Sequence, residues 1–453
     1  MSEKVSLIKA IINGLISIQG LGPGDITKGD DFGLPRLIPT GTGETIQINK
    51  VIDDEISRLA QVLKSEKPQL VKNVREEEWR SWVRSAIGPA LMQVKFSDPV
   101  DTSAANVLAL LEKDISSLLS NFGPSEYAFG TTFLQISGMP PLNIGPVTIE
   151  HREDWINRKL QDKSINATMH ARIMRVWQGA KIRPRAKNID NIRESDIKDA
   201  LGNSPFVCSV KVDGLSGEAG REIALSAARL GLACVSLVWE KSARVLSGMN
   251  LRGDSGMMRE RTLRFVPGKV TLQGSRIHGM PSGPSISNAD WQKELATRSD
   301  YFSAAGEILT YLVSADGKVP RPKLMNALMQ SMLWFYEGCR EGNDLIAIVD
   351  FAASLDALGG GKKARAILQV LEARLGADGS KPIYQGGPTL SSVIDTIYSD
   401  GRSRAIHGTS DKIGHDWART RSHAETLARL ALFASVDWAG ANPTIDDPAL
   451  LKK

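Results

Sequence analysis

An arginine and a histidine, Arg402 and His407, are separated by four residues near the end of a predicted helix. Histidine changes its charge near neutral pH, so His407 can accept or donate a proton. Arginine stays charged and presents a planar fork of N–H donors that fits phosphate oxygens. The pair can therefore combine proton transfer with stabilisation of negative charge on a phosphoryl group.

The spacing of this pair restricts the helix that carries it. Five positions along an α-helix turn the direction of a side chain by about 140°. Both side chains therefore share a face only if the helix ends or loosens between them, which Gly401 and Gly408 would allow. The alternative is an ordinary C-terminal cap, in which positive charge is favourable with the helix dipole.

The residues around the pair resemble a known family. The segment IYSDGRSRAIHG at 397–408 is similar to the Y…RSxxxHG signature of the ApeA-like branch of HEPN domains, and the helix at 344–358 resembles its acidic helix. Two positions depart from the signature. Tyr398 stands four residues before Arg402 rather than three, and the acidic position holds Asp356 rather than glutamate. The resemblance covers residues 320–440.

The resemblance implies a metal-independent endoribonuclease that needs no cofactor and belongs to bacterial antiphage defence by abortive infection. RNA supplies its own nucleophile, the 2′-hydroxyl beside the scissile phosphate, so cleavage needs a proton acceptor, a proton donor and a cation. Arg402 and His407 would be the catalytic residues. Since one chain holds one such pair, the resemblance also implies a homodimer through the C-terminal helices, with RNA bound in a shared cleft.

Four residues near the pair have supporting roles in this interpretation. Ser403 could hydrogen-bond a phosphate or orient the histidine. Asp356 could hold the arginine, with an ordinary salt bridge or a solvated position as the alternative. Arg404 and Tyr398 are candidate RNA contacts.

Two other functions stay open from the sequence. One is a non-catalytic HEPN subunit that binds RNA, a nucleotide signal or a partner effector enzyme within a defence complex. The other is an unrelated helical scaffold. Growth arrest and RNA cleavage that depend on His407 would separate the first interpretation from both.

Other polar clusters are interpreted as structural. His407, His415 and His423 recur every eight residues, which is not the HxxxH or HExxH spacing of helical zinc sites. The basic stretch at 181–187 (KIRPRAK) is interpreted as a solvated loop, with RNA contact as the alternative. The same choice stays open for three arginines on a predicted strand, Arg259, Arg261 and Arg264.

The composition is that of an ordinary globular chain. Of the 453 residues, 42% are hydrophobic and 24% are charged, which excludes wholesale disorder and fibrous structure. A net charge of +5 permits a nucleic-acid partner but does not argue for one. Three widely spaced cysteines form neither a disulfide framework nor a CxxC pair, so a reducing cytoplasm is expected. The apolar stretch at 5–18 is too short to span a bilayer, and no membrane partner is expected.

The patterns along the chain predict an α+β protein with three regions. Residues 1–125 are expected to be mostly helical, with helices at 48–64, 76–94 and 101–121 and an irregular loop at 21–45. Residues 126–287 are expected to form a strand-containing domain. Its predicted strands are 127–136, 146–150, 206–212 and 233–239, its predicted helices are 154–178 and 218–232, and a hairpin is predicted at 263–273.

The third region, residues 288–453, is predicted to be an all-α bundle whose HEPN-like core lies at 320–440. Short turns with Gly, Pro or Asp separate its helical patterns, and helices joined in this way pack antiparallel. The predicted helices are 291–314, 323–338, 344–358, 362–375, 390–404 and 414–439.

Overall fold

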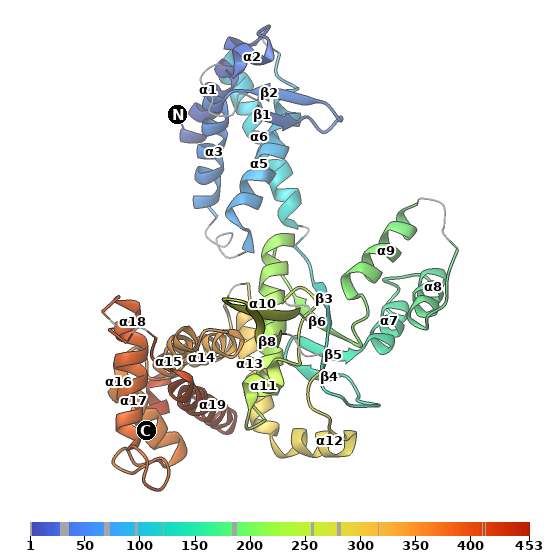
Figure 1. The fold of residues 1–453 in the computed structure, drawn as a ribbon. Coiled ribbons are helices and arrows are strands. Elements are labelled where there is room, and N and C mark those ends of the chain that lie inside the picture. Colours follow the sequence, from blue (N-terminus) through green and yellow to red (C-terminus); the bar gives the residue numbers. More distant parts are fainter. Residues whose placement is uncertain are drawn as a thin grey trace. The chain divides into compact units, whose positions relative to one another are not determined.

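The computed structural model describes the chain except for residues 1, 28–35, 68–72, 96–97, 121, 184–187, 255–257, 279–281, 316, 410 and 413. The described chain divides into two compact units (Figure 1). The first comprises Met1–Ser125 and Asp213–Glu222, and the second comprises Glu126–Val212 and Ile223–Lys453. The fold is α+β, as predicted, with small sheets and a helical C-terminal region.

The first unit is built from amphipathic helices around one apolar core. Its long helices are α1 (Glu3–Ser17), α3 (Lys50–Ser65), α5 (Glu76–Leu91) and α6 (Val100–Ser120). In α3 the buried residues recur every three or four positions, which places them on one face. The indole N–H of the fully buried Trp79 donates to the carbonyl oxygen of Ala60 at 2.7 Å, so α5 is joined to α3 through the core.

A short hairpin in this unit was not predicted. The predicted loop at 21–45 contains the helix α2 (Pro23–Ile26) and the strand β1 (Arg36–Pro39), which pairs antiparallel with β2 (Thr45–Ile48). The prediction of an irregular loop is therefore wrong for β1. Four-residue strands between glycines and prolines are too short to show an alternating pattern in the sequence.

The second unit begins with a four-stranded sheet in the order β3 (Ser125–Thr131), β6 (Phe206–Val212), β5 (Val147–His151) and β4 (Leu142–Ile144). β5 pairs antiparallel with both β6 and β4. Successive side chains of a strand point to opposite faces. As a result, Val147 contacts α10 (Gly217–Ser236) through Gly231, while Glu150 points toward α7 (Arg152–Gln161).

The predicted strand at 233–239 is wrong, because α10 continues through Ser236. Cys234 and Val235 are fully buried, and the hydroxyl of Tyr301 on α13 (Ser299–Val313) donates to the carbonyl oxygen of Cys234 at 2.8 Å. A helix segment buried on all sides is apolar at every position. Its sequence therefore looks the same as that of a buried strand.

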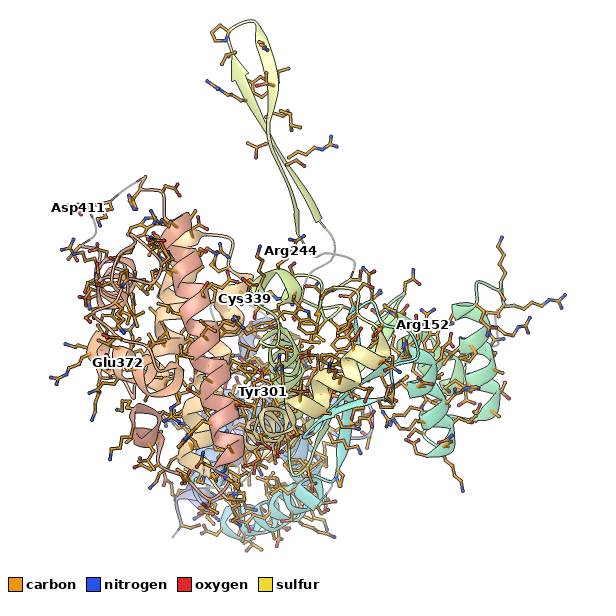
Figure 2. All side chains as sticks on the ribbon, turned by 90° about the horizontal axis from the view of Figure 1, so that it is seen from below. Arg152, Arg244, Tyr301, Cys339, Glu372 and Asp411 are labelled. Carbon is orange, nitrogen blue, oxygen red and sulfur yellow. The ribbon has the colours of Figure 1, made fainter. Side chains whose placement is uncertain are left out.

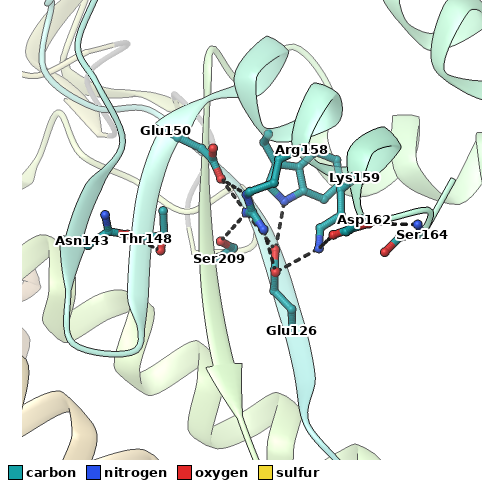
Figure 3. A network of polar contacts seen from close by, with 10 residues as sticks. Glu126, Asn143, Thr148, Glu150, Arg158, Lys159, Asp162, Ser164 and Ser209 are labelled. Atoms are coloured by element: carbon teal, nitrogen blue, oxygen red, sulfur yellow. Dashed lines mark hydrogen bonds and ion pairs between the residues drawn. The ribbon is translucent and has the colours of Figure 1, made fainter.

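A network of charged side chains joins α7 to the sheet (Figure 3). Arg158 bridges Glu126 on β3 and Glu150 on β5, and it reaches the hydroxyl of Ser209 on β6 between them. Burial would raise the pKa of Glu126, but hydrogen bonds from Arg158 and Lys159 hold it at about 2. The predicted helix at 154–178 is divided between α7 and α8 (Ala167–Trp177), and α9 (Ile189–Leu201) packs on α8.

The predicted hairpin at 263–273 is present and longer than expected. β7 (Met258–Val266) pairs with β8 (Lys269–His278) around the turn at Pro267 and Gly268. Within the described residues, these strands form a sheet of two strands only. Side chains stand on both faces of this ribbon (Figure 2), and the ring of Phe265 is 74% exposed.

The C-terminal region is mainly helical in its described residues, with a long irregular connection at residues 376–389. Its α-helices are α12 (Asn288–Thr297), α13 (Ser299–Val313), α14 (Pro322–Arg340), α15 (Asp344–Leu358), α16 (Lys363–Leu375), α17 (Leu390–Asp395), α18 (Arg404–Ile406) and α19 (Ala418–Ala441). A π-helix, η1 (Thr396–Ser403), lies between α17 and α18, and a 3-10 helix, η2 (Pro448–Lys452), follows α19. α14 and α19 both pack on α15, the most apolar of these helices.

The short α11 (Ser242–Leu246) connects α10 with the segment before the ribbon. All three cysteines are free. Burial raises the pKa of the Cys208 and Cys234 thiols to about 12, so neither is a reactive thiolate at neutral pH. In the described part of the chain, no helix is both long and apolar enough to cross a membrane.

Candidate functional site

The predicted site residues lie on two neighbouring elements of the C-terminal region. Asp356 is in the last turn of α15, whereas Tyr398, Arg402 and Ser403 belong to η1, which packs along α15. α18 carries Arg404, and His407 is its C-cap residue. The sequence predicted a helix at 390–404, with an end or a loosened turn between Arg402 and His407 if the two are to share a face; a π-helical turn was not predicted.

The π-helix changes the backbone hydrogen bonding next to the arginine. The N–H of Arg404 donates to the carbonyl oxygen of Ser399, five residues earlier. Gly401 is buried at the contact with α15, and a side chain there would collide with Cγ2 of Ile348. π-helical turns are rare and occur frequently at functional sites.

Arg402 is held by two side chains from different elements. Its Nη2 lies 3.2 Å from Oδ2 of Asp356, and its Nη1 donates to the hydroxyl of Tyr398 at 2.8 Å. The guanidinium carbon also lies 5.0 Å from the centre of the Tyr398 ring, within the range of a cation–π contact. The fork is therefore fixed in direction while a quarter of the side chain stays exposed.

Asp356 is in an unusual position for an acidic residue. A carboxylate in the last turn of a helix faces the negative end of the helix dipole, and this one is only 8% exposed. Its Oδ1 accepts a hydrogen bond from the backbone N–H of Lys363 at 3.2 Å, and Oδ2 faces Arg402. The two contacts offset the cost of burying the charge.

The helix that carries the histidine ends at the histidine itself. Gly408 adopts a left-handed conformation with φ of 65°, and its N–H donates to Ala405 while the N–H of Thr409 donates to Arg404. These two bonds are a Schellman motif, which satisfies the last carbonyl groups of the helix. His407 is exposed, and its ring forms no hydrogen bond or ion pair with the described residues.

The remaining predicted residues have separate surroundings. Arg404 forms an ion pair with Asp400 at 3.3 Å, and Lys412 contacts the same carboxylate at 2.7 Å. The hydroxyl of Ser403 has no partner among the described residues. The structure thus brings Arg402, Asp356 and Tyr398 together, but no contact joins the arginine to His407 within the described chain.

Arg402 also lies at one wall of a groove that the sequence analysis did not identify. The groove has a volume of about 560 Å³, and residues of α14 and α15 line it together with Arg402. We call it the Arg402 groove; its polar and aromatic lining residues include Lys323, Asn326, Gln330, Trp334, Asp356 and Arg402. The spacing of the α14 residues could have indicated that they share one face, but nothing in the sequence indicated that this face and Arg402 line the same groove.

The residues of the other polar clusters are only partly described. In the described chain, no group of three His, Cys, Asp or Glu residues could hold a metal ion. His415 packs edge-to-face on Trp417, and burial lowers the pKa of His423. Most of the basic stretch at 181–187 lies outside the described residues, as does the side chain of Arg259.

No protein-family model, curated protein or solved structure matches this chain.

Proposed function

We propose that the protein is a metal-independent endoribonuclease of the HEPN type that acts in antiphage defence. The observation that carries the proposal is the fixed arginine fork beside an open groove. Arg402 is oriented by Asp356 and Tyr398, and the helix ends one turn later so that the ring of His407 is accessible. These are a cation for phosphoryl oxygens and a group that transfers protons near neutral pH.

In the proposed reaction the 2′-hydroxyl of the substrate attacks the adjacent phosphorus. His407 accepts the proton of that hydroxyl, or donates one to the 5′-oxygen that leaves. Arg402 stabilises the charge that builds on the phosphoryl oxygens. Because Arg402 and His407 of one chain are not in contact, we propose that a second copy supplies the other half of the cleft.

The π-helix supports the resemblance at the position where the sequence departs from it. The signature has three residue steps from the tyrosine to the arginine, and this chain has four. Each backbone hydrogen bond of a π-helix joins residues five apart, whereas in an α-helix they are four apart. A π-helical turn can therefore accommodate one extra residue. Tyr398 and Arg402 remain hydrogen-bonded across η1.

The second departure is the shorter acidic side chain. Aspartate has one methylene group fewer than glutamate, yet Oδ2 of Asp356 lies 3.2 Å from Nη2 of Arg402. The close packing of η1 on α15 at Gly401 explains how the shorter carboxylate reaches the guanidinium. Asp356 is therefore proposed as a positioning residue for Arg402.

The proposed mechanism is tested by cleavage of RNA in the presence of EDTA. Cleavage should persist and leave 2′,3′-cyclic phosphate and 5′-hydroxyl ends, because the attacking oxygen belongs to the same ribose. His407→Ala should abolish growth arrest and cleavage. Arg402→Ala should lose about 10²–10³-fold in rate, as when one oxyanion-stabilising donor is removed. Arg402→Lys should recover little, because an ammonium group cannot reproduce the fork.

The matched control is His415→Ala, which removes another exposed histidine eight residues away and should leave cleavage unchanged. DNA, and RNA that lacks the 2′-hydroxyl at the cleaved position, should be inert. Metal-dependent cleavage that leaves 5′-phosphates, or full activity in His407→Ala, would contradict the mechanism.

A non-catalytic binding subunit is the second candidate, and one observation favours it. In the single chain both Nη atoms of Arg402 are already bonded, one to Asp356 and one to Tyr398. An arginine occupied in this way can stabilise the fold without meeting a substrate. Intact RNA and equal growth with wild type and His407→Ala, together with retained binding of a partner protein, would support this candidate.

A further inference from the structure

One face of α14 lines the Arg402 groove along its length. Lys323, Asn326, Gln330 and Trp334 are spaced by three or four residues, so their side chains lie on the same side of the helix. From the lysine to the tryptophan this face extends about 16 Å at the rise of an α-helix. Arg402 and Asp356 line the same groove.

Trp334 is the least expected residue on this face. Its neighbours Met332 and Phe335 are fully buried in the core, whereas Trp334 is 42% exposed and lines the groove. Large aromatic side chains are usually buried, and an exposed one that lines a groove offers a flat apolar surface to a ligand. Within the described residues, the Trp334 indole N–H has no hydrogen-bond partner.

The two amides between Lys323 and Trp334 present groups that suit the edge of a nucleobase. Oδ1 of Asn326 accepts hydrogen bonds from the Tyr311 hydroxyl at 3.2 Å and from Nε2 of Gln330 at 3.3 Å. These bonds orient both amides. They leave Nδ2 of Asn326 as a donor and Oε1 of Gln330 as an acceptor without a partner in the described part of the chain.

The charges of the groove suit a phosphate backbone. Lys323 lies at one end of the α14 face, and Arg402 also lines the groove. The carboxylate in the groove, Asp356, is paired with Arg402 and with the backbone N–H of Lys363, so it does not face the groove as an isolated negative charge. The volume of about 560 Å³ is in the range of small-ligand sites.

We propose that the Arg402 groove binds an unpaired nucleotide of a single-stranded RNA, with its base stacked on Trp334 and its phosphate toward Arg402. This inference rests on the proposed function, because it places RNA beside the proposed catalytic arginine. The inference extends the proposed function, because it names residues that hold the RNA strand. Stacking on an aromatic ring and hydrogen bonding to base edges are the usual means of recognising unpaired RNA.

Binding can be measured separately from cleavage. The full chain carrying His407→Ala is titrated with a labelled single-stranded RNA, and fluorescence anisotropy gives the affinity. Adding Trp334→Ala should weaken binding about 5- to 150-fold, the range for the loss of one base stack. Trp334→Phe should retain most of the affinity, because a phenyl ring also stacks. Leu333→Ala is the matched control, since Leu333 is exposed on the same helix but does not line the groove.

A strand of the same length without bases shows whether Trp334 contacts a base. Trp334→Ala should not change the affinity for this abasic strand. Unchanged RNA affinity in Trp334→Ala, with an unchanged melting temperature, would overturn the inference. An equal loss of affinity for the abasic strand would also overturn it, as would a loss of self-association in place of RNA binding, which would make Trp334 a protein contact.

The outcomes also separate this inference from the proposed function. If the wild type does not cleave RNA but its RNA binding still depends on Trp334, the nuclease proposal fails and the nucleotide site stands. If cleavage depends on His407 while Trp334→Ala binds and cleaves normally, the nuclease proposal stands and the nucleotide site fails.

Discussion

The two proposed catalytic residues differ in how they are held. The side chain of Arg402 is fixed in direction by Asp356 and Tyr398. The side chain of His407 is exposed at the end of α18. The types of these residues could be recognised from the sequence, since their chemistry is intrinsic. The Arg402–Asp356 contact joins positions 46 residues apart, and only the family resemblance indicated it.

Asp350 on α15 gives a prediction for the dependence of stability on pH. Burial raises its pKa from 3.8 to about 6, with smaller contributions from Glu341 and Glu337. Between these two pH values the folded chain binds a proton that the unfolded chain has lost. The free energy of unfolding therefore falls as the pH rises through this window. Asp350→Asn should stabilise the protein at pH 7 by up to about 1 kcal/mol, since water screens the half-exposed carboxylate.

Urea unfolding at pH 4 and pH 7 measures this effect. The gain should be much smaller at pH 4, where most of the Asp350 carboxyl groups are protonated in the folded protein and only part of those in the unfolded chain are ionised. Asp344→Asn in the same helix is the control, because it removes an ion pair with Arg421 and should give no gain at pH 7. A gain of equal size at both pH values would show that helix propensity, and not charge, is responsible.

At the scale of the elements, the contact between η1 and α15 decides where Arg402 lies. Gly401→Ala places a methyl group against Cγ2 of Ile348, which is bonded directly to Cβ and cannot swing away without a rotamer change. The two helices must separate, and we expect a loss of about 1–3 kcal/mol in the free energy of unfolding, as for other overpacked contacts. RNA cleavage should fall as well, because Arg402 moves away from Asp356.

The test is a double-mutant cycle with Ile348→Ala, which removes the atom in the way. The double variant should be less destabilised than the sum of the single variants, because the two substitutions share one contact. Additive losses in urea unfolding would mean that the methyl group does not meet Ile348.

Helices could be predicted better than strands from this sequence. The predicted helix at 344–358 coincides with α15, because its N-cap Asn343 and the glycines after Leu358 mark both ends. The strand β1 and the end of α10 could not be predicted, since one is too short and the other is apolar on every side. The π-turn of η1 has no sequence pattern of its own, because it depends on packing against α15.

At the scale of the whole molecule, the proposed function requires two chains. We expect a homodimer through the C-terminal helices, with Arg402 and His407 of both copies near the two-fold axis. Light scattering at decreasing protein concentration should give the mass of two chains and then of one, and cleavage should decline with the dimer. Full cleavage by a monomer would contradict the prediction. A different protein that supplies the second half of the cleft would contradict it in part.

The division of the chain into compact units was the feature that the sequence predicted least well. Residues 213–222 belong to the first compact unit although they follow the strand β6 of the second unit. A sequence pattern reports on neighbours in the chain, so it cannot show that a short segment packs with helices more than 100 residues earlier. For the same reason, the patterns in the first 320 residues predict helices and strands but indicate no role for that part of the chain.

The ribbon of β7 and β8 affects how self-association of the chain in solution is interpreted. Among the described residues its outer edges pair with no further strand, so they present unpaired backbone groups, and Leu263, Phe265 and Leu272 are exposed on it. Pairing at a sheet edge is open-ended, because each added copy can leave another edge free, whereas a two-fold interface closes after two chains. Growth in mass that continues with concentration therefore indicates the ribbon, and a plateau at two chains indicates the helices.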